Sequence, residues 1–486
     1  MGIVFKQSFI NTIILFLGFC IGGLNVLFLY THFLEAEYFG LITFLLSTAN
    51  MIMPLLIFGM QHTIIRYFSS YKTKEQRDNF LLTAVILPLA VIIPFSVIGV
   101  IFYEYIADYL GRENIIIKKY SYLIFYTSIF MGYFEVFYAW SRVQMKSVFG
   151  NFIKEVFARV CVSFLLIGVY YEWLNSEQFV YAVTVVYFLR MLIMKLYALN
   201  LYFPKIQWLG LPKNFKEIFS FSIYIIMAGS AGTILLEIDK FMIPQMKDIA
   251  EVAYYSVGVY IASVIAIPSR AMQQIINPIT AKELNANNLP EVENLYQKSS
   301  LNLLIVGGLL FLLINVNIQE VYRIIDKPEY SVGIYVVLII SLSEMIKLSL
   351  GTNGAILTNS KYYKAMFYYS MGMALSVIIL NKVLIEFMGI QGAALATFIV
   401  VLVFSFLKIL FLHHKMKMQP FTFKTRKLLT LILLLYLVFN FVDLKIDPFL
   451  SIAIKSTLLG LIFIFLVIKL KLSNDMNLLF NKLFKV

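Results

Sequence analysis

The amino-acid sequence predicts an all-α polytopic membrane protein with about 14 transmembrane helices. Of its 486 residues, 60% are hydrophobic and only 14% are charged, whereas soluble domains carry about 25% charged residues. The mean hydropathy of +0.83 agrees. The apolar residues also fall into long segments that are separated by short polar stretches. Lipid, not water, is therefore the expected solvent of most of the chain.

A helix that crosses a hydrocarbon core of about 30 Å needs roughly 20 mostly apolar residues. Of the fourteen segments that we assign, the seventh is long enough to be bent or tilted and the thirteenth is short. The first is expected to be a retained helix, because its apolar run is too long for a secretory signal and no cleavage-type site follows it. The segments are 8–30, 38–60, 80–103, 118–140, 152–171, 178–202, 217–243, 249–271, 298–318, 331–353, 361–385, 390–412, 427–442 and 449–469.

Lysine and arginine predict the orientation, because cytoplasmic loops carry an excess of both. With the N-terminus inside, the cytoplasmic ends and loops hold 25 of the 40 basic residues, the outer loops 9 and the helices 6. Acidic residues run the other way, with 17 outside, 7 inside and 3 in helices. Both termini are therefore expected in the cytoplasm. The net charge of +13 reflects this topology, and we expect no nucleic-acid binding.

The connecting loops are short, which excludes several classes of function. The longest, at about 272–297, is too small to be a domain. The sequence contains no phosphate-binding P-loop and no dinucleotide-binding glycine motif, so we expect no ATP hydrolysis by this chain. Cys20 and Cys161 both lie inside apolar segments and form no disulfide framework or metal spacing. No cofactor and no metal are predicted.

A weak internal repeat predicts the arrangement of the helices. "EAEYFGLITF" follows the first segment and "VAYYSVGVYI" follows the seventh, while Pro54 and Pro268 are each followed by a Met-Gln pair. Six helices separate the copies, so both halves keep the same orientation. This predicts two six-helix lobes around a central cavity, at 1–203 and 204–414. Two extra helices and a cytoplasmic tail would occupy 415–486.

A polar stripe runs along the fourth segment. Ser121, Ser128, Glu135 and Arg142 recur every seven residues, and Tyr138 lies between the last two. Such spacing places them on one helix face. A charge at mid-bilayer costs about 2.5–3.5 kcal/mol on insertion scales, so it normally faces protein or water. The stripe should therefore face either a cavity or a neighbouring helix.

The fifth and sixth segments carry two arginines of different depth. Arg190 lies near the centre of the sixth segment, with Tyr187 on the same face. Its guanidinium needs an anion, which Glu135, Glu155 or a substrate would supply. Arg159 follows Glu155 by one helical turn, and snorkelling to the membrane surface explains it nearly as well as a functional role.

The tenth segment carries Ser341, Glu344 and Lys347 at three-residue steps. Glu344 and Lys347 either neutralise each other, which lowers the cost of insertion, or line a cavity or proton site. Lys408 and Lys455 lie near helix ends, and we expect both to snorkel towards the membrane surface.

Three charges close the seventh segment in the stretch "LLEIDKFMIP". Glu237 and Lys240 are three residues apart and can pair, and Asp239 follows an apolar run. Asp239 shares a helix face with three small residues, Gly232, Ala231 and Ala228. Small residues mark a protein-facing side, so these charges are expected to face the protein interior. The alternative is an ordinary helix end that enters water.

Several stretches resemble polysaccharide biosynthesis proteins of the O-antigen flippase type. They are "AEYFGLITFLLS", "FGMQHTIIRYFSSY", "EIDKFMIPQMKDIAEVAYYSVGVYIASVIAIPSRAMQQIINPITA" and "FMGIQGAALATFI". The resemblance extends over nearly the whole chain and is most specific around Asp239. The parent superfamily also contains multidrug and toxin extruders and peptidoglycan-precursor flippases. Its members have two six-helix lobes, and some add two C-terminal helices.

The resemblance implies a substrate and a location. The substrate would be an oligosaccharide on an undecaprenyl pyrophosphate carrier, moved by alternating access across the bacterial cytoplasmic membrane for surface polysaccharide such as O-antigen. Lipid-linked oligosaccharide and membrane lipids would be partners, and a polysaccharide polymerase and a chain-length regulator are candidate protein partners. By analogy, the two last helices would border a groove for the prenyl tail.

Two sets of residues are candidates for the site. Arginine binds phosphate oxygens in pairs, and tyrosine can stack on sugars, so the substrate-binding candidates are Arg66, Arg142, Arg159, Arg190, Lys347, Tyr138 and Tyr187. Carboxylates in a low dielectric can exchange protons, so the candidates for coupling transport to protons or sodium are Glu135, Asp239 and Glu344. Transport driven by the concentration gradient of the lipid-linked sugar alone is the alternative.

Two other functions stay open from the sequence. One is a cation-coupled multidrug exporter, which would need an acidic lumen, although basic residues outnumber acidic ones six to three inside the helices. The other is a membrane-embedded polysaccharide polymerase or glycosyltransferase, which would need a sizeable outer loop for its catalytic residues.

Overall fold

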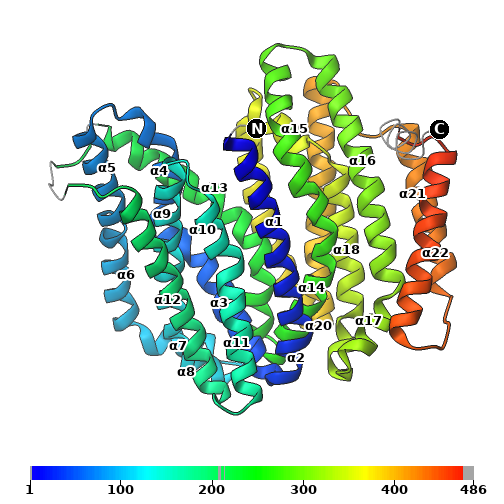
Figure 1. Cartoon of the computed structure of the whole chain (residues 1–486), viewed down its shortest axis with the longest axis horizontal. Coiled ribbons are helices and arrows are strands. Elements are labelled where there is room, and N and C mark those ends of the chain that lie inside the picture. Colours follow the sequence, from blue (N-terminus) through cyan, green and yellow to red (C-terminus); the bar gives the residue numbers. More distant parts are fainter. Residues whose placement is uncertain (1–2, 206–209, 213, 474–486) are drawn as a thin grey trace. The chain divides into compact units, whose positions relative to one another are not determined.

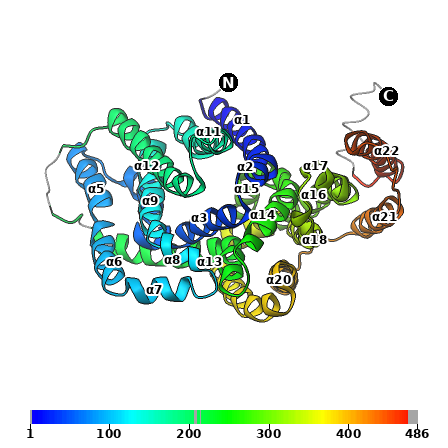
Figure 2. The same cartoon turned by 90° about the horizontal axis from the view of Figure 1, so that it is seen from below.

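A computed structural model describes residues 3–205, 210–212 and 214–473, and all regular secondary structure within them is helical (Figures 1 and 2). The chain divides into two compact units, residues 1–256 and 257–486, and each is described by itself. The far part of the predicted cytoplasmic tail, 474–486, lies outside the described residues.

Unit 1 is built around α3, which lies between α9 and α13 (Figure 2). Its core includes Phe134, Trp140 and Met194, all fully or almost fully buried. Its helices are α1 (Ile3–Leu24), the π-helix η1 (Asn25–Leu29), α2 (Tyr30–Phe33), α3 (Ala36–Leu56), α4 (Met60–Tyr67), η2 (Phe68–Ser70), α5 (Lys74–Ile86), α6 (Leu89–Ile101), α7 (Tyr103–Leu110), α8 (Ile115–Tyr120), α9 (Tyr122–Val143), α10 (Val148–Phe152), the π-helix η3 (Ile153–Phe157), α11 (Ala158–Tyr170), α12 (Ser176–Leu201), α13 (Phe215–Met242) and η4 (Ile243–Gln245).

A sharp turn separates α3 from α4. Phe58 and Gly59 both have positive φ angles, 49° and 62°, a conformation that glycine adopts most readily. A Cβ on Gly59 would lie 2.9 Å from a methyl carbon of Ile225 on α13. The turn therefore redirects the chain and brings α4 against both α9 and α13.

Unit 2 has its core on α16, which packs against α18, α21 and α22. Leu304 and Leu312 of α16 meet Leu348, Leu428 and Phe463 there. Its helices are α14 (Ala250–Ser263), which begins in unit 1, η5 (Val264–Ala266), α15 (Ile267–Asn285), α16 (Leu289–Val316), α17 (Ile318–Ile325), η6 (Pro328–Gly333), α18 (Ile334–Ser349), α19 (Asn353–Asn359), α20 (Tyr363–Met416), α21 (Phe423–Asn440) and α22 (Pro448–Lys469).

The unit boundary at 256 differs from the predicted lobe boundary at 203, because α13 packs on α3 and α4. The division into 1–203, 204–414 and 415–486, with a cavity between two lobes, therefore stays a prediction.

The all-α membrane fold class is confirmed. The predicted number of fourteen spans is not, because fewer helices in the described part of the chain have the length and composition of a membrane span. Eleven helices in the described residues are long and apolar enough to cross a membrane. The fifth predicted segment is divided among α10, η3 and α11, and the thirteenth corresponds to α21, which begins with three basic residues among its first five. The eleventh and twelfth predicted segments both lie within the single 54-residue helix α20.

Helix α20 is a hairpin rather than one continuous span. Gly389 interrupts it with φ 56° and ψ −135°. On either side of this residue the chain folds back, because the Tyr369 and Phe404 rings lie 6.5 Å apart and Lys408 Nζ lies 3.7 Å from Met373 Sδ. The two halves therefore run antiparallel, as the separate segments 361–385 and 390–412 predict.

Candidate functional site

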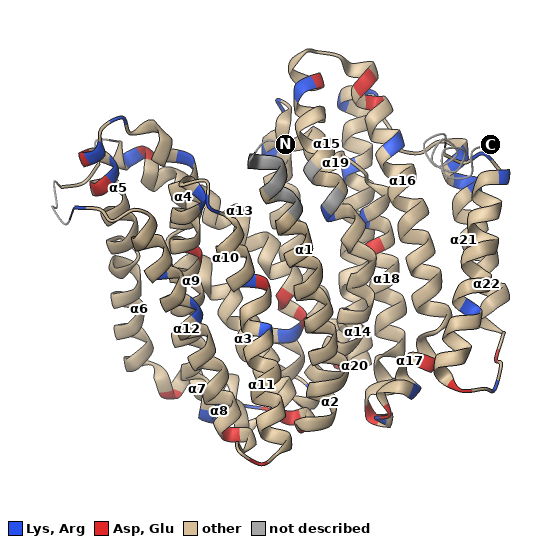
Figure 3. Cartoon of the chain, in the orientation of Figure 1, with Lys and Arg blue, Asp and Glu red and all other residues tan. Residues whose placement is uncertain are grey.

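Most charged residues lie near helix ends, and a smaller number lie at mid-helix (Figure 3). Arg190 lies near the midpoint of α12, which packs closely against α9. Its side chain lies over two aromatic rings, with the guanidinium carbon 4.0 Å from the Phe134 centroid and 5.5 Å from the Tyr187 centroid. Arg190 is only 8% exposed, which confirms the burial expected from its position.

The carboxylates expected to pair with Arg190 are held by other cations. Lys154 Nζ lies 2.7 Å from Glu135 Oε1, and Arg159 Nη1 lies 2.9 Å from Glu155 Oε2. Among the described residues, Arg190 has no carboxylate within ion-pair distance, and its buried Nε has no hydrogen-bond partner. Glu135, Glu155 and Arg159 are nevertheless close enough to act on it electrostatically.

We call Glu135, Lys154, Glu155, Arg159 and Arg190 the central charge group. It holds three cations and two carboxylates, so it carries one excess positive charge. The four paired members remain between 18% and 38% exposed. Charged side chains inside a lipid-embedded domain must reach water or a polar ligand. The group is therefore suited to receive an anion.

Lys154, which the sequence did not single out, reaches Glu135 from the π-helix η3. A π turn has i→i+5 hydrogen bonds and often occurs at functional sites. Within and after this turn, Lys154 pairs with Glu135 on α9, and Glu155 pairs with Arg159 on α11. The stretch "IKEVF" has no glycine or proline, so its sequence does not predict the irregular turn.

Helix α1 forms one wall of the central charge group. A Cβ on Gly18 would lie 2.7 Å from Arg159 Nη1 and 2.7 Å from the Glu155 carbonyl oxygen. Asn25 Nδ2 donates to the Arg159 carbonyl oxygen at 2.8 Å, and Ser163 Oγ donates to Asn25 Oδ1 at 2.6 Å. Gly18 and Asn25 are thus positioning residues that sequence analysis missed, although Asn25 is a polar residue inside an apolar segment.

Arg66 and Arg142 lie near helix ends and are both exposed. The guanidinium carbon of Arg66 is 4.3 Å from the Phe221 ring centroid, and that of Arg142 is 5.6 Å from the Tyr138 centroid. Neither has an ion-pair partner among the described carboxylates. One turn before Arg66, His62 lies within electrostatic reach of Glu135, Arg142 and Lys154.

The polar stripe on α9 has two different parts. Ser121 and Ser128 are buried and donate to carbonyl oxygens one turn earlier, at 3.1 Å and 2.6 Å. This part is a packed seam. Glu135, Tyr138 and Arg142 keep exposed surface, so only the second part of the stripe can reach a ligand.

The charges at the end of α13 face the interior of unit 1. Lys240 Nζ lies 2.9 Å from Glu237 Oε2, as the spacing predicts, and Asn50 Nδ2 donates to Glu237 Oε1 at 3.0 Å. Asp239 is buried and accepts a hydrogen bond from the hydroxyl of Tyr255. The small-residue argument is wrong for Gly232, which is exposed with open space beside it. The side chain of Ala228 lies outside the described ones.

Unit 2 contains two ion pairs of different character. Lys347 Nζ lies 2.7 Å from Glu344 Oε1, and this pair is partly exposed. Lys455 Nζ lies 2.6 Å from Glu320 Oε1, and these side chains are only 5% and 4% exposed. The snorkelling expected for Lys455 is therefore wrong, because α17 packs against α22 and presents the Glu320 carboxylate to the amine of Lys455.

Comparison with known proteins defines the family. A family model described as polysaccharide biosynthesis protein matches residues 6–281. The chain belongs to this family. No curated protein sequence matched significantly.

The fold is that of transporters of the MOP superfamily. The lipid II flippase MurJ in an inward closed conformation is 15% identical, with a TM-score of 0.72 over 97% of this chain and 100% of that one. An inward-facing multidrug resistance MATE family transporter is 13% identical, with a TM-score of 0.60 over 82% and 93%. The MATE multidrug transporter DinF-BH is 15% identical, with a TM-score of 0.56 over 85% and 95%. At these identities the similarity is one of fold.

Proposed function

We propose that the protein is a flippase for undecaprenyl-pyrophosphate-linked oligosaccharide in the bacterial cytoplasmic membrane. It would move these units from the cytoplasmic to the outer leaflet, where they are used for surface polysaccharide. Membership of the polysaccharide biosynthesis family and the fold shared with a lipid II flippase support this proposal. Both termini would face the cytoplasm, as the distribution of basic residues predicts.

The observation that carries the proposal is that Arg190 is buried without a carboxylate partner among the described residues. A buried guanidinium without a carboxylate partner is costly in a low dielectric, so the arrangement is favourable only when an anion arrives. A pyrophosphate has several oxygens that the planar guanidinium fork can bind in pairs. The excess positive charge of the central charge group also disfavours the cationic substrates that a multidrug exporter would carry.

Other cations and rings would extend the binding path. Arg66 and Arg142 would meet the pyrophosphate near the helix ends, and Arg190 would hold it at mid-depth. Several weak sites in series suit transport, because each must bind the substrate and also release it. Tyr138 and Tyr187 are partly exposed and have the flat faces that pack well against sugar rings. In unit 2, Lys347 is a further candidate.

Protons are the coupling ions that we favour, and Glu135 is the best-placed carboxylate. Its protonation would free Lys154 and raise the net charge of the central charge group by one. The group would then hold an anion more strongly. Asp239 and Glu344 remain candidates, but both lie outside the central charge group. Asp239 accepts a hydrogen bond from Tyr255, and Glu344 pairs with Lys347.

The test is restoration of surface glycan in a strain that lacks the protein. Arg190→Ala and Arg66→Ala should abolish glycan export while the protein still inserts, and the exposed Arg323→Ala serves as the control. Normal export by both variants would refute the assigned anion site. Dye resistance without an effect on glycan would favour a multidrug exporter, and shortened chains with intact translocation would favour a polymerase or transferase.

A further inference from the structure

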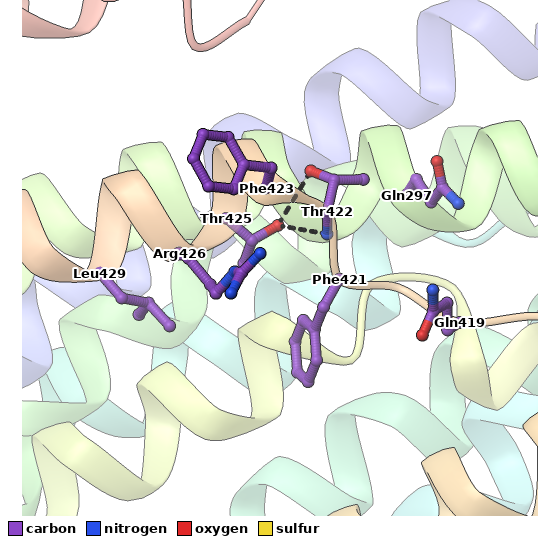
Figure 4. A pocket seen from close by; sticks show the side chains of 8 residues that line it. All are labelled: Gln297, Gln419, Phe421, Thr422, Phe423, Thr425, Arg426 and Leu429. Atoms are coloured by element: carbon purple, nitrogen blue, oxygen red, sulfur yellow. Dashed lines mark hydrogen bonds between the residues drawn. The ribbon is translucent and has the colours of Figure 1, made fainter.

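Unit 2 contains a pocket of about 520 Å³ where the start of α21 and the preceding linker meet α16 (Figure 4). Its lining combines polar and apolar side chains. The polar residues are Gln297, Gln419, Thr422, Thr425 and Arg426, and the apolar residues are Phe421, Phe423 and Leu429. Figure 4 shows that they come mainly from the linker and the first two turns of α21.

Among the described residues that line this pocket, Arg426 carries the charge, which is positive. The guanidinium of Arg426 has no ion-pair partner among the described carboxylates and lies 5.1 Å from the Phe423 ring centroid. The segment from 415 to 442 contains no acidic residue. Its basic residues are Lys415, Lys417, Lys424, Arg426 and Lys427. Clusters of this kind beside a membrane-spanning helix attract anionic lipids.

The apolar lining of the pocket continues along α21. Leu429, Leu433 and Leu437 follow Arg426 at three, seven and eleven residues and therefore share its helix face. They are 45%, 57% and 47% exposed. The 18 residues of α21 span about 27 Å, close to the thickness of the hydrocarbon core. A cation at one end and an exposed leucine ridge below it match the outline of a phospholipid.

We propose that this pocket binds the phosphate headgroup of an anionic glycerophospholipid from the surrounding membrane. Arg426 contacts the phosphate oxygens, Gln297 and Gln419 donate to headgroup or glycerol oxygens, and an acyl chain lies along the three leucines. The lining holds one guanidinium and two neutral amides, which suits a singly charged phosphodiester better than a pyrophosphate. The site is separate from the central charge group, which is made of residues of unit 1.

The test is lipid titration of the whole purified protein in detergent, followed by native mass spectrometry. Phosphatidylglycerol should bind more tightly than phosphatidylcholine, and Arg426→Ala should weaken the binding of phosphatidylglycerol about tenfold. Lys427→Ala is the matched control, because Lys427 lies on the same turn, 4.9 Å from the same Phe423 ring, but does not line the pocket. Lys427→Ala should weaken the binding of phosphatidylglycerol less than Arg426→Ala does, because Lys427 adds only to the general attraction of the basic segment for anionic lipid.

Two further variants and two competition experiments test whether a phospholipid occupies the pocket. Arg426→Lys keeps the positive charge but loses the paired donors of the guanidinium, so the folded variant should bind phosphatidylglycerol with intermediate affinity. Leu433→Asn should also weaken phosphatidylglycerol binding, and inorganic phosphate should not displace the lipid. Equal losses in Arg426→Ala and Lys427→Ala, or displacement by inorganic phosphate, would overturn the proposal. So would a preference for undecaprenyl pyrophosphate over phosphatidylglycerol, because the pocket would then belong to the substrate path.

Discussion

The central charge group in unit 1 and the Glu320–Lys455 pair in unit 2 both place charges inside the helical bundle, but in opposite ways. Glu320 and Lys455 are almost fully buried and carry opposite charges that cancel, and Ser451 also donates to Glu320 at 3.3 Å. The central charge group has one cation too many, and its paired members remain partly exposed. The first arrangement is closed and balanced, and the second is open and unbalanced.

The difference shows which property of a buried charge indicates function. A matched buried pair is often no more favourable than well-packed apolar side chains, yet breaking it is costly. It can therefore hold two helices together without binding anything. Arg190 has no carboxylate partner among the described residues, and its contact with α9 is to the Phe134 ring, so its charge is better explained by a ligand than by packing.

The largest effect is expected for Lys455→Met. Glu320 would be left as an uncompensated buried carboxylate, so the free energy of unfolding should fall by about 3–5 kcal/mol. Equilibrium denaturation of the purified protein measures this change. The double variant Lys455→Met with Glu320→Leu should recover most of the loss, and a double variant as unstable as the single one would show that the pair is not a closed unit.

Arg190→Met should slow transport without lowering the stability of the protein, unlike Lys455→Met. Loss of a charge-assisted contact worth about 1.5–3 kcal/mol should slow translocation roughly 10- to 100-fold. The stability of the protein should be unchanged or higher, because an unpaired buried charge has been removed. Flipping of a fluorescent lipid-linked oligosaccharide in proteoliposomes reports the rate, and Arg190→Lys should be intermediate. A loss of stability as large as that of Lys455→Met would contradict the comparison.

A smaller effect is expected for Gly18→Ala, which probes the wall of the central charge group. The new methyl group would displace Arg159 or the Glu155 carbonyl, at a cost of about 1–3 kcal/mol. Gly460→Ala on α22 is the matched control, because no atom lies within 4 Å of its Cβ position. Thermal denaturation should show a lower midpoint for the first variant and an unchanged or higher midpoint for the second.

The smallest effect is expected for Lys347→Met. The Glu344–Lys347 pair is local and partly exposed, so its loss should change the free energy of unfolding by less than about 1 kcal/mol. The same denaturation experiment measures it. A value near that of Lys455→Met would mean that exposure does not distinguish the two pairs of unit 2.

The parts of this structure that depend on local sequence could be predicted. Every predicted apolar segment overlaps a helix, because length and hydropathy alone determine whether a segment suits a bilayer. The pairs Glu237–Lys240, Glu344–Lys347 and Glu155–Arg159 follow from helical spacing and are all present. The depth of Arg190 follows from its position in the segment.

The parts of the structure that depend on contacts between helices could not be predicted from the sequence. Lys154 joins Glu135, and Lys455 joins Glu320, across different helices, and no spacing rule brings such residues together. The π-helix η3 changes the register of the fifth segment without a glycine or proline as a signal. The same limit explains the wrong expectation for Lys455, because its position near a helix end did not reveal that α17 covers it.

The reversal at Gly389 has a consequence for how unit 2 can deform. A single residue with φ 56° and ψ −135° connects two long helices, a backbone geometry that is essentially restricted to glycine. A connection of one residue restricts the movement of the two halves relative to each other. The short connection and the contacts between the two halves of α20 favour their movement as one unit.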